Sequence, residues 1–258
     1  MPYFALPRRQ PIRLPLARCT LGMAALALLA GCISRPESPI LEPAVGTVAA
    51  ATATDLPSAA GLAQRHPDAA RDEKAAWRAL APAWKVSLAG ADPCSDAESQ
   101  SLSCFHGSGS TLALIRQLGR PGIVSLRDES GAPVYALLVG LGEQSATLRF
   151  GTSTETLPIA TLARLWRGDF ATFWRVPPGY QNRIVDVDSG PAADWLAEHL
   201  AKLDGRAAPI DAAAFKASVA AFQVAQGLKA DGLAGPTTFM QLNRAIGIDE
   251  PRLMSSAN

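Results

Sequence analysis

The sequence lacks three features that would each have placed the protein in a broad class. Its apolar run at residues 21–30 is about ten residues long, whereas a membrane-spanning helix needs roughly 20. It contains no Gly-x-x-x-x-Gly-Lys-Ser/Thr loop, so we expect no nucleotide-driven action. It has no basic excess: beyond residue 31 there are 20 basic and 23 acidic residues, a balance that does not indicate a nucleic-acid surface.

What is present is typical of a folded protein. Hydrophobic residues make up 48% of the chain and charged residues 18%. This composition indicates a globular protein. At 258 residues, one or two domains are expected once any processed segment is removed.

Residues 1–31 are typical of an export signal. Four arginines precede the apolar run, and this segment has no acidic residue. The sequence Leu29-Ala30-Gly31-Cys32 follows directly and resembles the bacterial lipobox, whose cysteine is lipidated and becomes the mature N-terminus. We therefore expect Cys32 to anchor the protein at the periplasmic face of the outer membrane. The alternative is cleavage by an ordinary signal peptidase, with Cys32 incidental.

Residues 32–74 are rich in Ala, Pro, Ser and Thr and show no sustained periodicity. Such a segment buries too little apolar surface to offset the entropy lost on ordering. We predict a flexible tether.

The last quarter of the chain predicts three short helices. Apolar residues recur at helical spacing over residues 191–203, 212–226 and 236–246, with Asp211 as an N-cap and Pro236 at a first helical position. The spacing resembles the three-helix peptidoglycan-binding module found beside many cell-wall enzymes. That resemblance is carried by Val219, Phe222, Gln223, Gly227, Leu228, Asp231, Gly232, Gly235, Thr237 and Leu242.

The apolar and glycine positions of this motif are expected to serve the core and the turns. The polar positions are the candidates for peptidoglycan contact, with helix capping or turn bonding as the alternative. These candidates are Gln223, Asp231, Thr237, Thr238 and Asn243.

The region before this module predicts helices around residues 77–84, 112–118 and 159–166, and strands at 122–127, 134–139, 145–150 and 170–176. Short turns between sequential strands favour an antiparallel sheet. Cys94 and Cys104 lie ten positions apart, and in an exported protein such a pair is expected to form a disulfide. A metal site would need more ligands than His106 adds, so we predict neither a metal nor a cofactor.

This order of elements resembles the papain-like domain of double-glycine-leader peptidases. A closer resemblance is to the periplasmic part of the ExeA/GspA proteins of type II secretion, in which a degenerate domain of this kind precedes a peptidoglycan-binding module. The residues that carry it are Cys94, Cys104, Arg120, Pro121, Val134, Tyr135, Ala136, Leu137, Leu138, Trp166, Gly168, Trp174, Arg175 and Pro177.

The resemblance implies that the peptidase-like domain is not catalytic. Where the peptidases have their histidine this chain has Val134-Tyr135, and where they have the orienting aspartate it has Gly151-Thr152. A cysteine peptidase needs a base and a group that orients it.

The predicted fold class is therefore α+β. We divide the chain into a signal peptide (1–31), a tether (32–74), a degenerate cysteine-peptidase-like domain with an antiparallel sheet (75–178), a linker (179–190), a three-helix peptidoglycan-binding domain (191–248) and a tail (249–258).

The predicted function is that of a non-catalytic outer-membrane lipoprotein that binds peptidoglycan and acts with components of a type II secretion system or a related envelope machine. One alternative is a thiol peptidase or amidase acting on wall or leader peptides, with Cys94 or Cys104 and His106 as a dyad. Another is a protein-interaction adaptor whose three-helix module no longer binds the wall.

Overall fold

The computed structural model describes residues 57–127, 132–181, 190–206 and 211–255. The predicted signal peptide, Cys32 and most of the predicted linker lie outside these residues. Within them, no helix combines the length and the apolar character needed to cross a membrane. The described residues form one compact unit.

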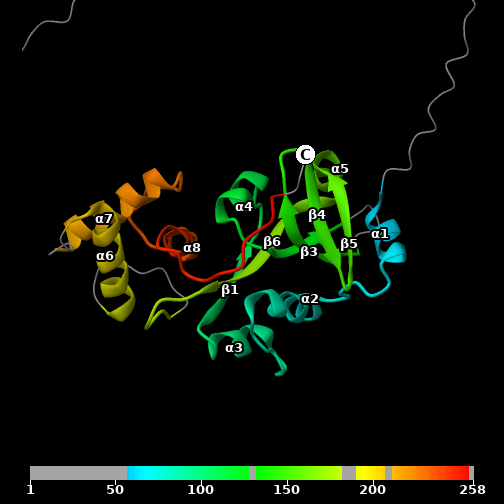
Figure 1. The fold of residues 1–258 in the computed structure, drawn as a ribbon, viewed down its shortest axis with the longest axis horizontal. Helices are drawn as coiled ribbons and strands as arrows, with labels where there is room; N and C mark the ends of the chain where they lie inside the picture. Colours follow the sequence, from blue (N-terminus) through cyan, green and yellow to red (C-terminus); the bar gives the residue numbers. More distant parts are fainter. Residues whose placement is uncertain (1–56, 128–131, 182–189, 207–210, 256–258) are drawn as a thin grey trace, which may run out of the picture. The chain divides into compact units, whose positions relative to one another are not determined.

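The centre of this unit is a six-stranded sheet in the order β1-β6-β2-β3-β4-β5, in which all neighbours are antiparallel (Figure 1). This confirms the predicted α+β class and the antiparallel sheet. The two edge strands, β1 and β5, were not predicted. The strands are β1 (Leu102–Gly107), β2 (Gly122–Leu126), β3 (Val134–Leu141), β4 (Ser145–Phe150), β5 (Ser153–Pro158) and β6 (Trp166–Arg175).

The two faces of the sheet bury different sets of residues, because successive side chains along a strand point to opposite sides. On one face Ile123, Leu137 and Phe173 pack with the N-terminal helices. On the other face the next residue of each strand, Val124, Leu138 and Trp174, packs with the later helices. The first set of helices is α2 (Glu73–Leu80), η1 (Ala81–Trp84) and α3 (Pro93–Glu98), and the second includes α4 (Leu112–Leu118) and α5 (Ile159–Leu165).

The predicted tether is too long, because residues 57–74 are folded. Helix α1 (Ala59–Arg65) is N-capped by Ser58, whose hydroxyl accepts from the backbone N–H of Gly61, and it buries Leu62 completely. Asp72 caps α2 in the same way, accepting from Ala75 N–H at 2.8 Å. The few apolar residues of this segment are enough to fold it, because they pack on a surface of the sheet. Composition alone does not show that such a surface is present.

The three C-terminal helices form at the expected places: α6 (Pro191–Asp204), α7 (Ala212–Ala225) and α8 (Pro236–Ala245). Asp211 is the N-cap of α7, and its carboxylate accepts from Ala214 N–H at 2.7 Å. Pro236 occupies the first turn of α8.

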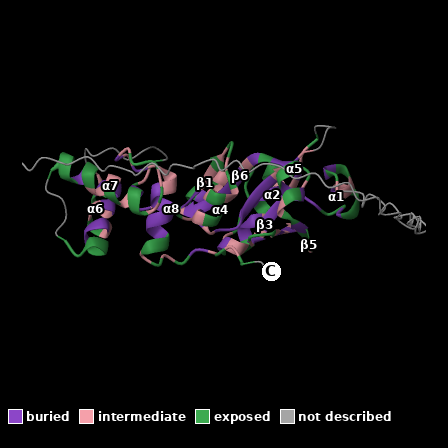
Figure 2. Ribbon diagram, turned by 90° about the horizontal axis from the view of Figure 1, so that it is seen from above, coloured by how far each residue is buried: buried purple, intermediate pink, exposed green. Residues whose placement is uncertain are grey.

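These helices do not form a domain separate from the sheet. The Phe239 ring of α8 stacks on Trp174 of β6 with centroids 5.8 Å apart, and residues of α6, α7 and α8 belong to the same core as those of the sheet. Six consecutive residues of α8 are buried. Figure 2 shows purple, the colour of buried residues, on this helix. Three short helices bury little surface by themselves, so the shared core supplies what the module lacks.

The predicted tail is also part of the fold. Glu250 is buried, and its carboxylate lies 3.0 Å from the guanidinium of Arg120, another fully buried side chain. The backbone of Leu253 donates to Gly119 O, and that of Met254 donates to Val139 O, each at 2.9 Å. The chain after α8 therefore returns to the sheet. The sequence did not predict this, because this segment has no apolar periodicity.

Candidate functional site

Gln223, the central polar residue of the C-terminal motif, is part of an internal network. Its side chain is buried in α7. The amide Nε2 lies 3.0 Å from Leu233 O and 3.2 Å from both Asp231 Oδ1 and Thr238 Oγ1, while Oε1 accepts from Gly232 N–H at 2.9 Å. The network holds the 226–235 loop against α7 and α8. The side chains of Gln223 and Thr238 therefore bond to other groups of the same chain.

Asn243 is also buried and engaged. Its amide donates to Arg175 O at 2.8 Å and to Glu250 Oε1 at 3.1 Å, so it joins α8 to the end of β6. For Gln223, Thr238 and Asn243 the structure therefore favours the structural alternative over direct contact with a ligand. The partner atoms lie 7 to 68 positions away in sequence, and residue spacing alone does not show which side chains and carbonyls meet, so the motif did not separate the two roles.

Asp231 and Thr237 remain accessible. A backbone hydrogen bond from Leu233 is the largest cause of the lowered pKa of the Asp231 carboxyl, although burial opposes it; Gln223 and Lys229 contribute as well. Thr237 is half-buried in the first turn of α8, next to this loop. The accessible polar part of the motif is therefore the loop before α8 and the start of that helix.

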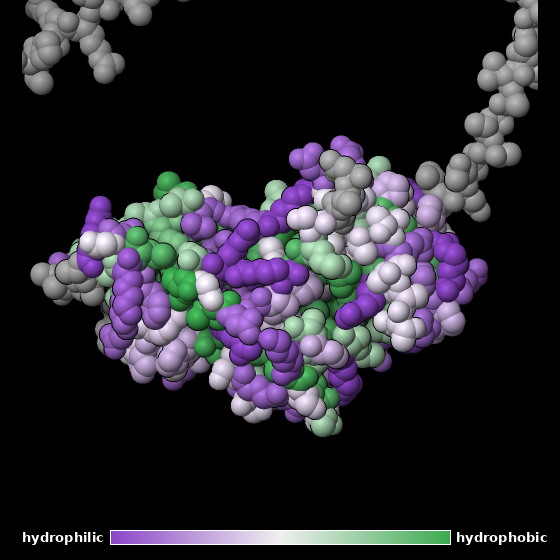
Figure 3. All heavy atoms as spheres, in the orientation of Figure 1, coloured by the Kyte–Doolittle hydropathy of each residue, from purple (hydrophilic) through white to green (hydrophobic). Residues whose placement is uncertain are grey.

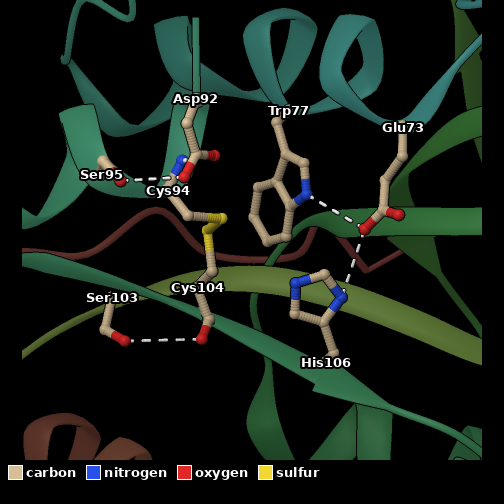
Figure 4. The surroundings of a disulfide bond; sticks show 8 residues. All are labelled: Glu73, Trp77, Asp92, Cys94, Ser95, Ser103, Cys104 and His106. Atoms are coloured by element: carbon tan, nitrogen blue, oxygen red, sulfur yellow. Dashed lines mark hydrogen bonds and ion pairs between the residues drawn. A yellow bond between two sulfur atoms is a disulfide. The ribbon is translucent and has the colours of Figure 1, made fainter. Parts of the chain in front are cut away.

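The structure joins Cys94 and Cys104 in a disulfide between α3 and β1 (Figure 4). Asp92 caps α3, accepting from the backbone N–H of Cys94 at 3.2 Å. With both sulfur atoms bonded to each other, neither can act as a nucleophile in this state.

His106, two residues after Cys104 on β1, forms a polar cluster with α2. Its Nδ1 lies 3.2 Å from Glu73 Oε1, and the Trp77 indole N–H donates to the same oxygen at 3.3 Å (Figure 4). The potential ligand atoms of Cys94, Cys104 and His106 all lie within 4.8 Å of one another. The sequence did not predict a metal site at His106. In the structure, the packing of α3 beside β1 places Cys94 close to this histidine.

A cleft of about 250 Å³ opens beside this cluster. Tyr135, at the place where the resemblance puts the peptidase histidine, lies in it. Burial raises the pKa of the Tyr135 phenol and the Glu73 charge adds to this, so the phenol stays protonated at neutral pH and is no base there. The lining residues are Glu73, His106, Gly107, Ser108, Ile123, Ser125, Arg127, Tyr135, Asp169, Phe170 and Ala171.

His66, which the sequence placed in the tether, is buried between α1 and β5. Its Nδ1 lies 2.9 Å from Ser153 Oγ, its Nε2 lies 2.8 Å from Glu155 Oε2, and its ring stacks on Phe150. The Ser153 hydroxyl also lies 3.2 Å from Phe150 O, so it has a backbone acceptor as well as the imidazole within reach. The arrangement ties the N-terminal helix to the sheet edge.

Together these elements define an α+β protein in which a six-stranded antiparallel sheet, a disulfide beside a polar cleft, and three C-terminal helices share one compact unit. No protein-family model matches the sequence. The chain is similar to General secretion pathway protein A of Aeromonas hydrophila, with 33% identity over 164 residues. The match covers 62% of this chain and 30% of that protein, so this chain spans about a third of its relative's length.

Among solved structures, the chain is similar to a periplasmic domain of the EpsAB fusion protein of the Vibrio vulnificus type II secretion system. The TM-score is 0.48 at 21% identity, covering 71% of this chain and 83% of that domain. The 33% identity to General secretion pathway protein A confirms the similarity to a general secretion protein that the residues predicted. The degenerate peptidase origin of the sheet region stays a prediction.

Proposed function

We propose that the protein is a non-catalytic component of the cell envelope that acts with a type II secretion system and binds peptidoglycan through its C-terminal helices. The observation that carries this proposal is the 33% identity to General secretion pathway protein A over 164 residues. Lipidation of Cys32 would place the protein at the outer membrane, with the segment before residue 57 bridging the distance to the wall.

The wall-binding surface that we propose is the 226–235 loop with the start of α8. Its accessible polar side chains are Asp231 and Thr237, while Gln223 and Thr238 shape the loop from inside. Figure 3 shows hydrophilic and hydrophobic side chains interspersed on the face drawn. The large exposed hydrophobic residues of the described chain are Leu203, Val224 and Met254, and they lie on different elements. Recognition of the wall would therefore rest on polar and small groups.

The absence of peptidase activity is part of the proposal. The disulfide engages Cys94 and Cys104, and Tyr135 lies where the resemblance expects the base. A thiol peptidase or amidase would need a free cysteine, so the full chain treated with an alkylating reagent without reductant should show no labelling at these two positions. Labelling of either one in the folded protein would favour the enzymatic alternative.

Co-sedimentation with purified peptidoglycan sacculi tests wall binding. We expect the full chain with Cys32→Ala, which removes the lipid, to sediment with sacculi. Thr237→Arg should weaken binding about tenfold, equivalent to about 1.4 kcal/mol, because it places a long side chain on the proposed surface. Thr154→Arg, the same change at an exposed position of β5, is the matched control and should bind normally.

No sedimentation of the parent chain, or equal binding by both threonine variants, would contradict the proposed surface. The link to secretion is tested separately: a strain without the gene should retain type II substrates in the periplasm, and normal export from that strain would refute the link.

A further inference from the structure

The cluster of Cys94, Cys104 and His106 has no role in the proposed wall binding, yet its geometry is that of a set of metal ligands. Cys104 and His106 are two positions apart on β1, so their side chains point to the same face of that strand. Cys94, in the first turn of α3, meets them from the other side. All three ligand atoms lie within 4.8 Å of one another.

The imidazole of His106 is oriented as in a metal site. Its Nδ1 lies 3.2 Å from the Glu73 carboxylate, which is within reach of an Nδ1–H when Nε2 carries the lone pair. Figure 4 shows this second nitrogen on the side of the ring that faces the sulfur atoms. A histidine that binds a metal almost always donates its other N–H to a carboxylate, carbonyl or water. Glu73 is itself fixed by the Trp77 indole at 3.3 Å.

We propose that reduction of the Cys94–Cys104 disulfide converts this cluster into a Zn²⁺ site. A dithiol reductant supplies two electrons and two protons to the disulfide and is itself oxidised to a disulfide. The two thiols then lose their protons as Zn²⁺ binds, and the ligands are the two thiolates and His106 Nε2. Glu73 is a positioning residue that holds the imidazole.

The surroundings allow the required movement. At Zn–S distances of about 2.3 Å, tetrahedral geometry places the two sulfur atoms about 3.8 Å apart. Cys94 is only half-buried at the start of a six-residue helix, so a side-chain rotation there separates the sulfurs without disturbing β1. His106 lines the adjacent cleft and its side chain is 56% exposed, so a water molecule can reach a metal held there and complete the site. Two thiolates, an imidazole and an open position make a ligand set that zinc uses in proteins.

The experiment uses the full chain with Cys19→Ser and Cys32→Ser, so that only the two cysteines of the cluster remain. The oxidised and the phosphine-reduced forms are titrated with Zn²⁺ against a chromophoric chelator, and with Co²⁺, whose absorption reports thiolate ligation and tetrahedral geometry. We expect one Zn²⁺ per reduced chain and none in the oxidised chain. His106→Ala should weaken binding and change the Co²⁺ spectrum, whereas His199→Ala, a histidine on α6, should do neither.

Glu73→Gln adds a test that separates positioning from mere folding. Loss of an outer-shell carboxylate typically lowers metal affinity by about 10–100-fold, so zinc affinity should fall in that range while the stoichiometry stays at one.

Three results would overturn the proposal: equal zinc binding by the oxidised and reduced chains, unchanged affinity in His106→Ala, or no binding by a reduced chain whose near-ultraviolet circular dichroism is native. A reduced chain that loses this spectrum and does not regain it with Zn²⁺ would overturn it as well.

Discussion

Replacing Glu250 with alanine should strongly destabilise the fold, because this side chain joins the C-terminal segment to the sheet and to α8. The side chains of Glu250 and Arg120 are 0% exposed, with Oε2 3.0 Å from Arg120 Nη2. The other carboxylate oxygen accepts from Arg175 N–H at 2.9 Å and from the Asn243 amide at 3.1 Å. Arg120 also donates to Met240 O at 3.0 Å and to Leu118 O at 3.4 Å, so in the variant its guanidinium keeps two carbonyl partners but no negative charge beside it.

The expected loss follows from this geometry. Removing one partner of a buried ion pair leaves an uncompensated charge and costs about 3–5 kcal/mol. The Arg175 N–H and the Asn243 amide also lose an acceptor, which places the expected value in the upper half of this range. Since whole domains are stable by only about 5–15 kcal/mol, the variant should lose a large fraction of its free energy of unfolding.

Urea unfolding of the full chain, followed by tryptophan fluorescence, measures this loss. Asp249→Ala is the matched control: that side chain is 84% exposed and pairs with Lys85, which is 77% exposed, so its removal should change stability by less than about 0.5 kcal/mol. The double variant Arg120→Met/Glu250→Leu removes both charges and should recover much of the loss. A loss below about 1 kcal/mol in Glu250→Ala, or a double variant as unstable as the sum of its single changes, would refute the reasoning.

Three further predictions concern other parts of the described chain. Leu62→Ala should cost about 2–5 kcal/mol in the same unfolding assay, because this side chain is fully buried; an unchanged midpoint would show that residues 57–66 are not part of the core. Serine at both Cys94 and Cys104 should cost about 2.5–3 kcal/mol on the chain-entropy account, and a smaller value would mean that the unfolded chain is already restricted there. The backbone and hydroxyl of Thr152 hold the pKa of Asp68 below its ordinary 3.8, so its stabilising effect is present above pH 3.8 and is lost as the pH falls through the lowered value. Asp68→Asn should therefore flatten the decline of stability on that acid side, and an unaltered pH profile would contradict the assignment.

Much of the secondary structure could be predicted from local patterns. The helices at 112–118, 191–203 and 212–226 and the strand at 145–150 follow from apolar spacing, and Asp211 marks the start of the third of these helices. The edge strands β1 and β5 were missed. In β5 one residue of six is buried, so its apolar signal is weak. In β1 the burial does not alternate along the strand, so it lacks the period-two pattern that predicts a strand.

The candidate site was less predictable than the fold. The spacing pattern singled out Gln223, and Asn243 beside it, as polar residues, but spacing does not show whether an amide bonds to solvent or to a distant backbone carbonyl. For His106 the sequence underestimated the site, because it offered too few neighbouring ligands to predict a metal. In the structure, α3 packs beside β1 and brings His106 close to two sulfur atoms, and α2 places Glu73 beside its ring.

The sequence by itself determined the α+β class, the positions of most helices and strands, the proximity of the two cysteines and the similarity to a secretion protein, because all of these depend on periodicity, spacing and residue identity along the chain. Only the tertiary structure decided that residues 57–74 and 249–255 belong to the fold, that the three C-terminal helices share the core of the sheet, and that Glu250 neutralises Arg120. Those outcomes depend on which surfaces meet when the chain folds, and contacts such as the one between residues 120 and 250 leave no local pattern.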